Sequence, residues 1–118
     1  RVAPSTGNTL QLRIDAPVKH LAKRPSAGFE ILASTSRSQA ATMLLEAGES
    51  TGGPDNRHEA ADQWIFVVSG TGKAIVEGQT VDLAPGSLLL IEPGEGHEII
   101  STGSDALDTV TFYSPPEY

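Results

Sequence analysis

The stretch PGSLLLIEPGEGH, residues 85–97, decides the fold class. Its four consecutive apolar residues, 88–91, form a short strand between two turns, and the second turn ends directly at His97. Glycines recur every eight residues along this part of the chain, at 70, 78, 86 and 94. Short strands separated by turns at such even spacing predict a β-sandwich or β-barrel. The segments between the glycines are not self-similar, so they do not indicate a solenoid.

The same pattern extends outward and predicts eight short strands, most of them rich in β-branched or aromatic residues. We expect them at 29–35, 40–45, 62–69, 73–77, 79–83, 87–91, 97–101 and 107–113. Residues 1–28 are mixed and polar, and we expect an N-terminal arm there, partly flexible, with a short strand at 10–14. Residues 29–118 then form one all-β barrel domain.

Length, charge and cysteine content exclude several classes of protein. The chain has 118 residues, which is one domain, and a net charge of −7 from 15 acidic and 8 basic residues. An acidic chain lacks the electrostatic footprint of a nucleic-acid binder, and neither a basic run nor a long apolar run indicates a membrane partner. The absence of cysteine excludes disulfides and thiolate metal sites. It also fits a cytoplasmic protein, which is the location we expect.

Residues 56–70 and 85–97 together resemble the two motifs of the cupin superfamily, in outline G-x5-H-x-H-x3-4-E-x6-G and G-x5-P-x-G-x2-H-x3-N. Counting back from the closing Gly70 places Gln63 where the family has Glu, His58 at its second His and Asn56 at its first. His97 falls at the third His. The resemblance implies a single cupin-type jelly-roll, or double-stranded β-helix barrel, with a metal pocket at its wider mouth.

The residues at these positions form a set of neutral metal donors. His58 and His97 supply imidazole nitrogens, and Gln63 and Asn56 supply amide oxygens, which together suit a divalent transition metal such as Fe, Mn, Ni or Zn. Because no donor is charged, the ion keeps a charge near +2, binds weakly and favours an anionic ligand. Two structural alternatives remain open: Gln63 is a buried amide bonded to the barrel backbone, and Asn56 caps a turn.

Two carboxylates beside the first motif, Glu59 and Asp62, are candidate catalytic residues. Either one can transfer a proton if it reaches the pocket. Alternatively, it can form a hydrogen bond to a metal ligand without binding the metal, or replace Gln63 as the ligand if the strand register is shifted. The first functional hypothesis is therefore a metal-dependent enzyme of oxygenase or isomerase type acting on a small anionic or oxygenated molecule. The alternatives are a non-catalytic module that binds or senses a small ligand with weak or no metal, and a structural domain with a vestigial pocket.

The strand at 62–69 predicts a homodimer as well as part of the metal pocket. Trp64 and Phe66 alternate with Gln63, so they face the side of the sheet opposite to the pocket. Both faces of this strand are apolar, so we expect the outer face to be covered by the N-terminal arm or by a second subunit. We therefore predict a homodimer.

Overall fold

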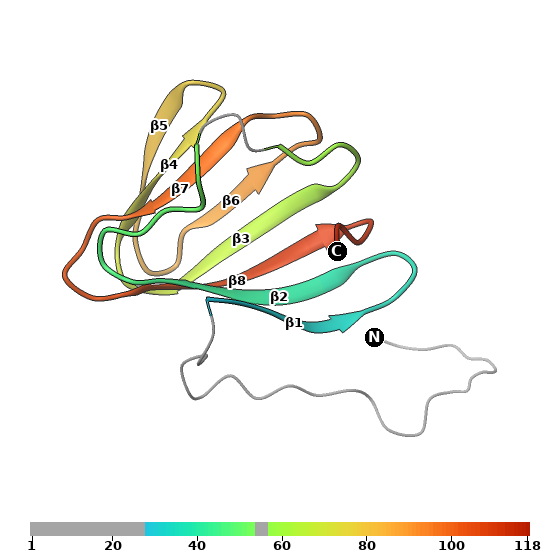
Figure 1. The fold of residues 1–118 in the computed structure, drawn as a ribbon, viewed down its shortest axis with the longest axis horizontal. Helices are drawn as coiled ribbons and strands as arrows, with labels where there is room; N and C mark the ends of the chain where they lie inside the picture. The colour runs from blue at the N-terminus through green and yellow to red at the C-terminus, as the bar shows by residue number, and fades with distance from the viewer. Residues whose placement is uncertain (1–27, 54–56) are drawn as a thin grey trace.

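The computed structural model describes residues 28–53 and 57–118 and contains eight β-strands there, with no helix in those residues (Figure 1). The strands are β1 Phe29–Ser34, β2 Gln39–Leu45, β3 Asp62–Ser69, β4 Gly72–Val76, β5 Gln79–Leu83, β6 Leu88–Ile91, β7 His97–Ser101 and β8 Leu107–Ser114. All eight predicted strands are confirmed, each with ends within one residue of the expected position. The predicted N-terminal arm, apart from Gly28, lies outside the described residues.

The strands form two antiparallel sheets, which confirms the all-β jelly-roll class. One sheet has the order β1-β2-β8-β3-β6, and the other has the order β5-β4-β7. Figure 1 shows the two sheets converging at one end and splaying apart at the other, so that they enclose a barrel with one wide mouth. The crossed strand order is that of a double-stranded β-helix, because consecutive strands alternate between the sheets from β5 to β8.

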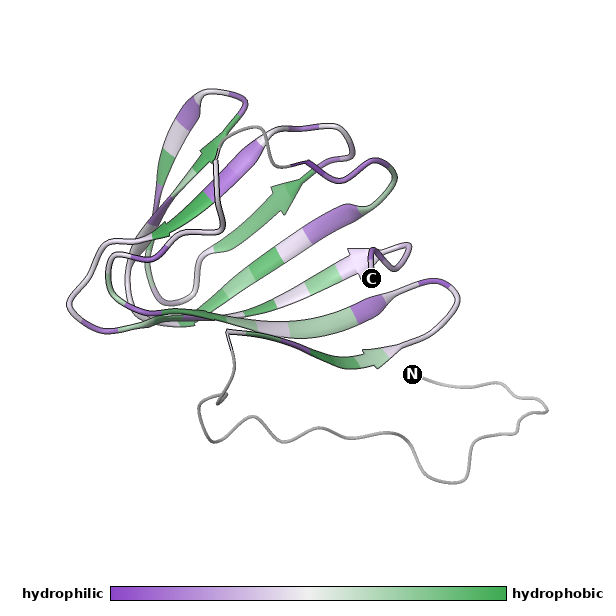
Figure 2. Ribbon diagram, in the orientation of Figure 1, coloured by the Kyte–Doolittle hydropathy of each residue, from purple (hydrophilic) through white to green (hydrophobic). Residues whose placement is uncertain are grey.

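The core fills the space between the sheets through the two-residue period of the strands. On β3, Gln63, Ile65 and Val67 are buried, whereas the residues between them are exposed. The rest of the core comes from β2, β4, β5, β6, β7 and β8, which contribute Met43, Leu45, Ala74, Leu83, Ile91, Ile99 and Leu107. A fully buried leucine, isoleucine or methionine side chain contributes about 1.5–3 kcal/mol. Figure 2 shows hydrophilic residues at the ends of β3 and β7 that face the wide mouth. The barrel is therefore apolar inside and polar where it opens.

The glycine rhythm has a conformational cause. The four glycines that fall eight residues apart all have positive φ, a region that other residues rarely adopt. Gly70, between β3 and β4, is the most constrained, since a Cβ there would collide with the carbonyl oxygen of Ala106. The even spacing therefore reflects turns whose positive φ favours glycine.

The outer face of the five-stranded sheet remains apolar and accessible in the described part of the chain. Trp64 and Phe66 point away from Gln63, as the alternation predicts, and each is 40% exposed. Phe112 of β8 and Leu88 of β6 lie in the same two cross-strand rows, because Trp64 pairs with Phe112 and Phe66 pairs with Leu88. In the residues described, no helix is long and apolar enough to cross a membrane.

Candidate functional site

Three of the predicted metal ligands lie together in one cavity at the wide mouth. His58, Gln63 and His97 are each at most 5% exposed, and all three line a cavity of about 490 Å³. Gln63 is an inward residue of β3 in one sheet, and His97 opens β7 in the other. The cavity therefore lies between the sheets, at the polar ends of β3 and β7.

Two loops hold the histidines side by side. The backbone N–H of Gly94, in the turn before His97, donates to the carbonyl oxygen of His58 at 2.7 Å. The side chain of Arg57 donates to the carbonyl oxygen of Gly94 at 2.5 Å. These bonds tie the PGEG turn to the segment that leads into β3. The ring centroids of His58 and His97 are consequently 4.9 Å apart, with the ring planes 33° from parallel.

Gln63 is oriented by its neighbours on β8. Its amide nitrogen donates to Thr111 Oγ1 at 3.0 Å and to Tyr113 Oη at 3.2 Å. The amide oxygen is thereby turned toward His58 Nε2, which lies 2.8 Å from it. The alternative interpretation expected a buried amide bonded to the barrel backbone, whereas the nitrogen of Gln63 is bonded to two side-chain hydroxyls. The oxygen faces the cavity.

Both histidines have an acceptor beside Nδ1. Glu117 Oε2 lies 3.3 Å from His58 Nδ1, and the carbonyl oxygen of Glu95 lies 3.2 Å from His97 Nδ1. In His58, Nε2 donates to the Gln63 oxygen, because an amide oxygen only accepts. Nδ1 of His97 donates to the Glu95 carbonyl oxygen, which leaves the lone pair of that ring on Nε2. Histidines that bind metals are commonly oriented in this way, by an acceptor on the ring nitrogen that does not coordinate.

Burial sets the charge state of two site residues. Burial lowers the pKa of His97, and the neighbouring His58 lowers it further, although the bond to Glu95 acts in the opposite direction. Burial likewise raises the pKa of Tyr113, and the adjacent Tyr118 adds to that rise. The structure therefore favours a neutral imidazole at His97 and a neutral phenol at Tyr113, which are the forms that bind a metal and donate a hydrogen bond.

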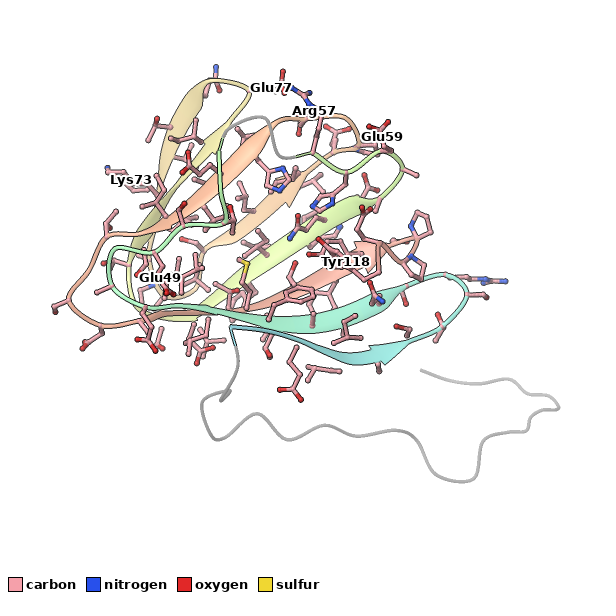
Figure 3. All side chains as sticks on the ribbon, viewed as in Figure 1. Glu49, Arg57, Glu59, Lys73, Glu77 and Tyr118 are labelled. Atoms are coloured by element: carbon pink, nitrogen blue, oxygen red, sulfur yellow. The ribbon has the colours of Figure 1, made fainter. Side chains whose placement is uncertain are left out.

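Aromatic rings form another wall of the cavity. Tyr118 packs edge to face against Tyr113, with ring centroids 5.4 Å apart, and against Phe29 at 5.2 Å. Figure 3 shows Tyr118 beside the wide mouth, between the two sheets. Both Tyr118 and Phe29 line the cavity and are partly exposed. The cavity therefore combines a polar wall of imidazoles and an amide with an apolar aromatic wall.

The remaining predicted site residues lie elsewhere. Glu59 is exposed on the loop before β3 (Figure 3), and Asp62 is half-buried at the first residue of that strand. Neither residue lines the cavity, because Asp62 alternates with the inward Gln63 and Glu59 points into solvent. Asn56 lies outside the described residues.

Sequence reasoning missed the residues that orient the three predicted metal ligands. Thr111 and Tyr113 were findable, because alternation along the predicted strand at 107–113 places both on one face. Glu95 acts through its backbone carbonyl, so its side chain gave no signal. Glu117 had no signal at all, because only the tertiary fold brings it to His58.

The donor set fits a divalent metal. Two ligands that sit about 2.0–2.2 Å from one ion at a near-right angle are about 3 Å apart. The 2.8 Å between His58 Nε2 and Gln63 Oε1 is the length of a hydrogen bond, and it is also close to that separation. Within residues 28–53 and 57–118 no group of three His, Cys, Asp or Glu residues is suitably placed to hold a metal. A metal in this cavity would therefore depend on the oxygen of Gln63 as its third donor.

A small antiparallel double-stranded β-helix with two histidines at its wide mouth defines the class of protein. The family model described as the cupin domain matches residues 41–113, and the chain belongs to the cupin family. This confirms the resemblance inferred from the two motifs. A search of curated proteins found no match.

Solved structures with the same fold include three bacterial proteins. KdgF from a Halomonas species is 26% identical, with a TM-score of 0.68 over 75% of this chain and 77% of that one. A predicted oxalate decarboxylase from Thermotoga maritima is 24% identical, with a TM-score of 0.68 over 75% and 79%. A protein from Bacillus halodurans is 24% identical, with a TM-score of 0.76 over 80% and 75%. These likenesses establish the fold.

Proposed function

We propose that the cavity binds a divalent transition metal through His58, His97 and Gln63. The carrying observation is that His58, His97 and Gln63 line one buried cavity while Nδ1 of both rings and the amide nitrogen of Gln63 face other partners. In the metal-free protein, Nε2 of His58 donates to the Gln63 oxygen at 2.8 Å, because an amide oxygen only accepts. A bound divalent ion would replace that proton and accept lone pairs from both atoms.

The metal proposal extends to the class of ligand. When bound, the metal would act as a Lewis acid toward an oxygen of the ligand. Because His58, His97 and Gln63 are neutral, the ion keeps its charge and favours a small anionic or oxygenated molecule. The neutral Tyr113 hydroxyl can donate a hydrogen bond nearby, and Tyr118 with Phe29 can pack against apolar parts of the ligand.

The reaction we propose is of oxygenase or isomerase type, with the metal as the reactive centre. One observation favours a second candidate, a module that binds or senses a small ligand without turnover. Glu59 and Asp62, the carboxylates expected to transfer protons, do not line the cavity. Both candidates use the same cavity. The second would hold its ligand with weak or no metal and would not convert it.

Metal analysis tests the proposal directly. The protein is purified without a nickel column or chelator, its metal content is measured by mass spectrometry, and Fe²⁺, Mn²⁺, Ni²⁺ and Zn²⁺ are titrated by calorimetry. We expect about one ion per chain for at least one metal. Failure of every metal to bind at millimolar concentration would refute the proposal. Incubation with a metabolite mixture then separates the candidates, because an enzyme depletes a compound whereas a binding module only retains it.

We also propose a homodimer, which would cover the outer face of the five-stranded sheet. Trp64, Phe66 and Phe112 are each at least 40% exposed there, and a continuous exposed apolar patch is typical of an interaction surface. Neither a nucleic acid nor a membrane is part of this proposal, because the net charge of −7 opposes both. A location in the cytoplasm stays a prediction.

A further inference from the structure

The aromatic wall of the cavity is a continuous series of rings. Phe29, Tyr118 and Tyr113 follow one another, with centroids 5.2 and 5.4 Å apart and ring planes at 61° and 78°. Tyr113 continues the series to His58, whose ring centroid lies 5.3 Å away at 71°. Every contact in the series is edge to face, which is one of the two arrangements that aromatic pairs prefer. The series therefore links the rim of the cavity to a proposed metal ligand.

The two rings at the rim are exposed although both line the cavity. Phe29 is 39% exposed and Tyr118 is 65% exposed. Exposed aromatic rings at the mouth of a cavity are stabilised when a bound molecule covers them and removes their apolar surface from water. Met43, Leu45 and Ile99, which belong to the core, add further apolar side chains to the lining. The part of a ligand that faces this wall is therefore expected to be apolar.

Tyr118 is held at the rim by a buried glutamine. Gln39 of β2 is 2% exposed, and its amide oxygen accepts the backbone N–H of Tyr118 at 3.0 Å. Its amide nitrogen donates to the carbonyl oxygen of Tyr118 at 2.8 Å. The same amide bonds the backbone N–H of Glu117 and the hydroxyl of Ser34, so both of its donors and both oxygen lone pairs are used. A ring on a backbone fixed in this way loses less freedom when a ligand binds, which favours affinity.

We propose that Tyr118 is a specificity-determining residue, which makes the cavity select a carboxylate that carries a flat aromatic ring. The carboxylate would bind the metal, and the ring would lie against Tyr118 and Phe29. This inference rests on the proposed metal site, which supplies the positive charge for the carboxylate. The cavity of about 490 Å³ has the size of a site for a ring-sized molecule, and an acid as small as acetate would leave most of it unfilled.

Benzoate and cyclohexanecarboxylate are matched probes of this selectivity. Each has one carboxylate on one carbon ring of the same size, but only the flat ring of benzoate can extend the edge-to-face series. Apolar area alone would favour the bulkier cyclohexanecarboxylate. In calorimetric titrations of the metal-loaded wild type, we expect benzoate to bind at least about threefold more tightly than cyclohexanecarboxylate. Acetate, which has no ring, should bind more weakly than benzoate.

Substitutions of Tyr118 separate its ring from its apolar bulk. Tyr118→Phe keeps the ring and should keep the preference for benzoate. Tyr118→Leu keeps apolar bulk without a ring, so the preference should disappear or reverse. Gln39→Ala keeps the ring but removes its attachment, and it should reduce the preference in part. Val81→Ala is the control and should keep the wild-type preference, since Val81 is an exposed apolar residue of β5 that does not line the cavity.

The outcomes separate this inference from the proposed function. If the wild type binds metal but does not prefer benzoate, or binds neither acid, this inference is refuted while the metal site stands. An unchanged preference for benzoate in Tyr118→Leu also refutes it, because the ring of Tyr118 would then play no part. If the wild type binds no metal, the proposed function fails, and titration of both acids into metal-free protein decides the role of Tyr118 by the same criteria. Should Gln39→Ala not fold, the two Tyr118 variants decide.

Discussion

Replacement of Gln63 by Glu tests the charge of the proposed metal site. Gln63 lies at the position where the cupin motif has Glu, and its oxygen is 2.8 Å from His58 Nε2. The substitution changes the shape of the side chain little and adds one negative charge beside the ion. The amide nitrogen becomes a second carboxylate oxygen, and the Thr111 and Tyr113 hydroxyls, which now accept from that nitrogen, can rotate to donate to it.

The size of the effect follows from two opposing terms. A unit charge about 4 Å from another contributes about 4 kcal/mol at an effective dielectric constant of about 20, and a divalent ion doubles this figure. Against it stands the cost of burying a carboxylate, several kcal/mol at a side chain that is 3% exposed. We therefore expect metal affinity to rise by at least about tenfold, or about 1.4 kcal/mol.

Although Gln63→Glu should raise metal affinity, it should lower the stability of the metal-free protein. Without a cation, the buried carboxylate is poorly compensated, so the free energy of unfolding should fall by about 1–3 kcal/mol. Metal addition should then raise the melting temperature of Gln63→Glu more than that of the wild type. An anionic ligand should bind the metal-loaded variant more weakly, because the net charge that it meets is lower by one.

Calorimetric titration of wild type, Gln63→Glu and the control Gln79→Glu measures these effects. Gln79 is an exposed residue of β5 that does not line the cavity, so its substitution adds the same charge at a distance. Equal metal affinity in wild type and Gln63→Glu would show that Gln63 is not a ligand. The residue would then be only a buried amide that links His58 to Thr111 and Tyr113.

Four further predictions concern the second histidine, acid stability, the outer face and the turn after β3. His97→Ala should abolish metal binding in a calorimetric titration while circular dichroism keeps the β spectrum, because His97 is the first residue of β7. Burial lowers the pKa of His97, so the metal-free protein should lose stability as pH falls below about 6.5, since only the unfolded state then binds the proton. A melting temperature that stays level from about pH 7 to about pH 5 would contradict this. Trp64→Glu together with Phe66→Glu should convert a dimer to a monomer in sedimentation, and a wild-type monomer at high micromolar concentration would argue against the dimer. Gly70→Ala should lower the free energy of unfolding by about 2 kcal/mol or more, as chemical denaturation will measure, since φ there is 86° and the added Cβ meets the carbonyl of Ala106.

The amino-acid sequence by itself determined the strands and the inward-facing donors. Alternation and glycine spacing are local properties, so they placed all eight strands and assigned Gln63 and Trp64 to opposite faces. The spacing of the two motifs also singled out His58 and His97. Their meeting in one cavity follows from the cupin topology, which the motifs indicated.

Only the tertiary structure decided which groups orient these metal ligands and which carboxylates lie beside them. Glu59 and Asp62 are close to His58 in sequence, yet they lie outside the cavity, because a loop points one into solvent and strand alternation turns the other away. Glu117 is far from His58 in sequence and lies beside it, because Gln39 fixes the backbone after β8. Contacts of this kind depend on how separate strands pack together, and no local pattern of residues encodes them.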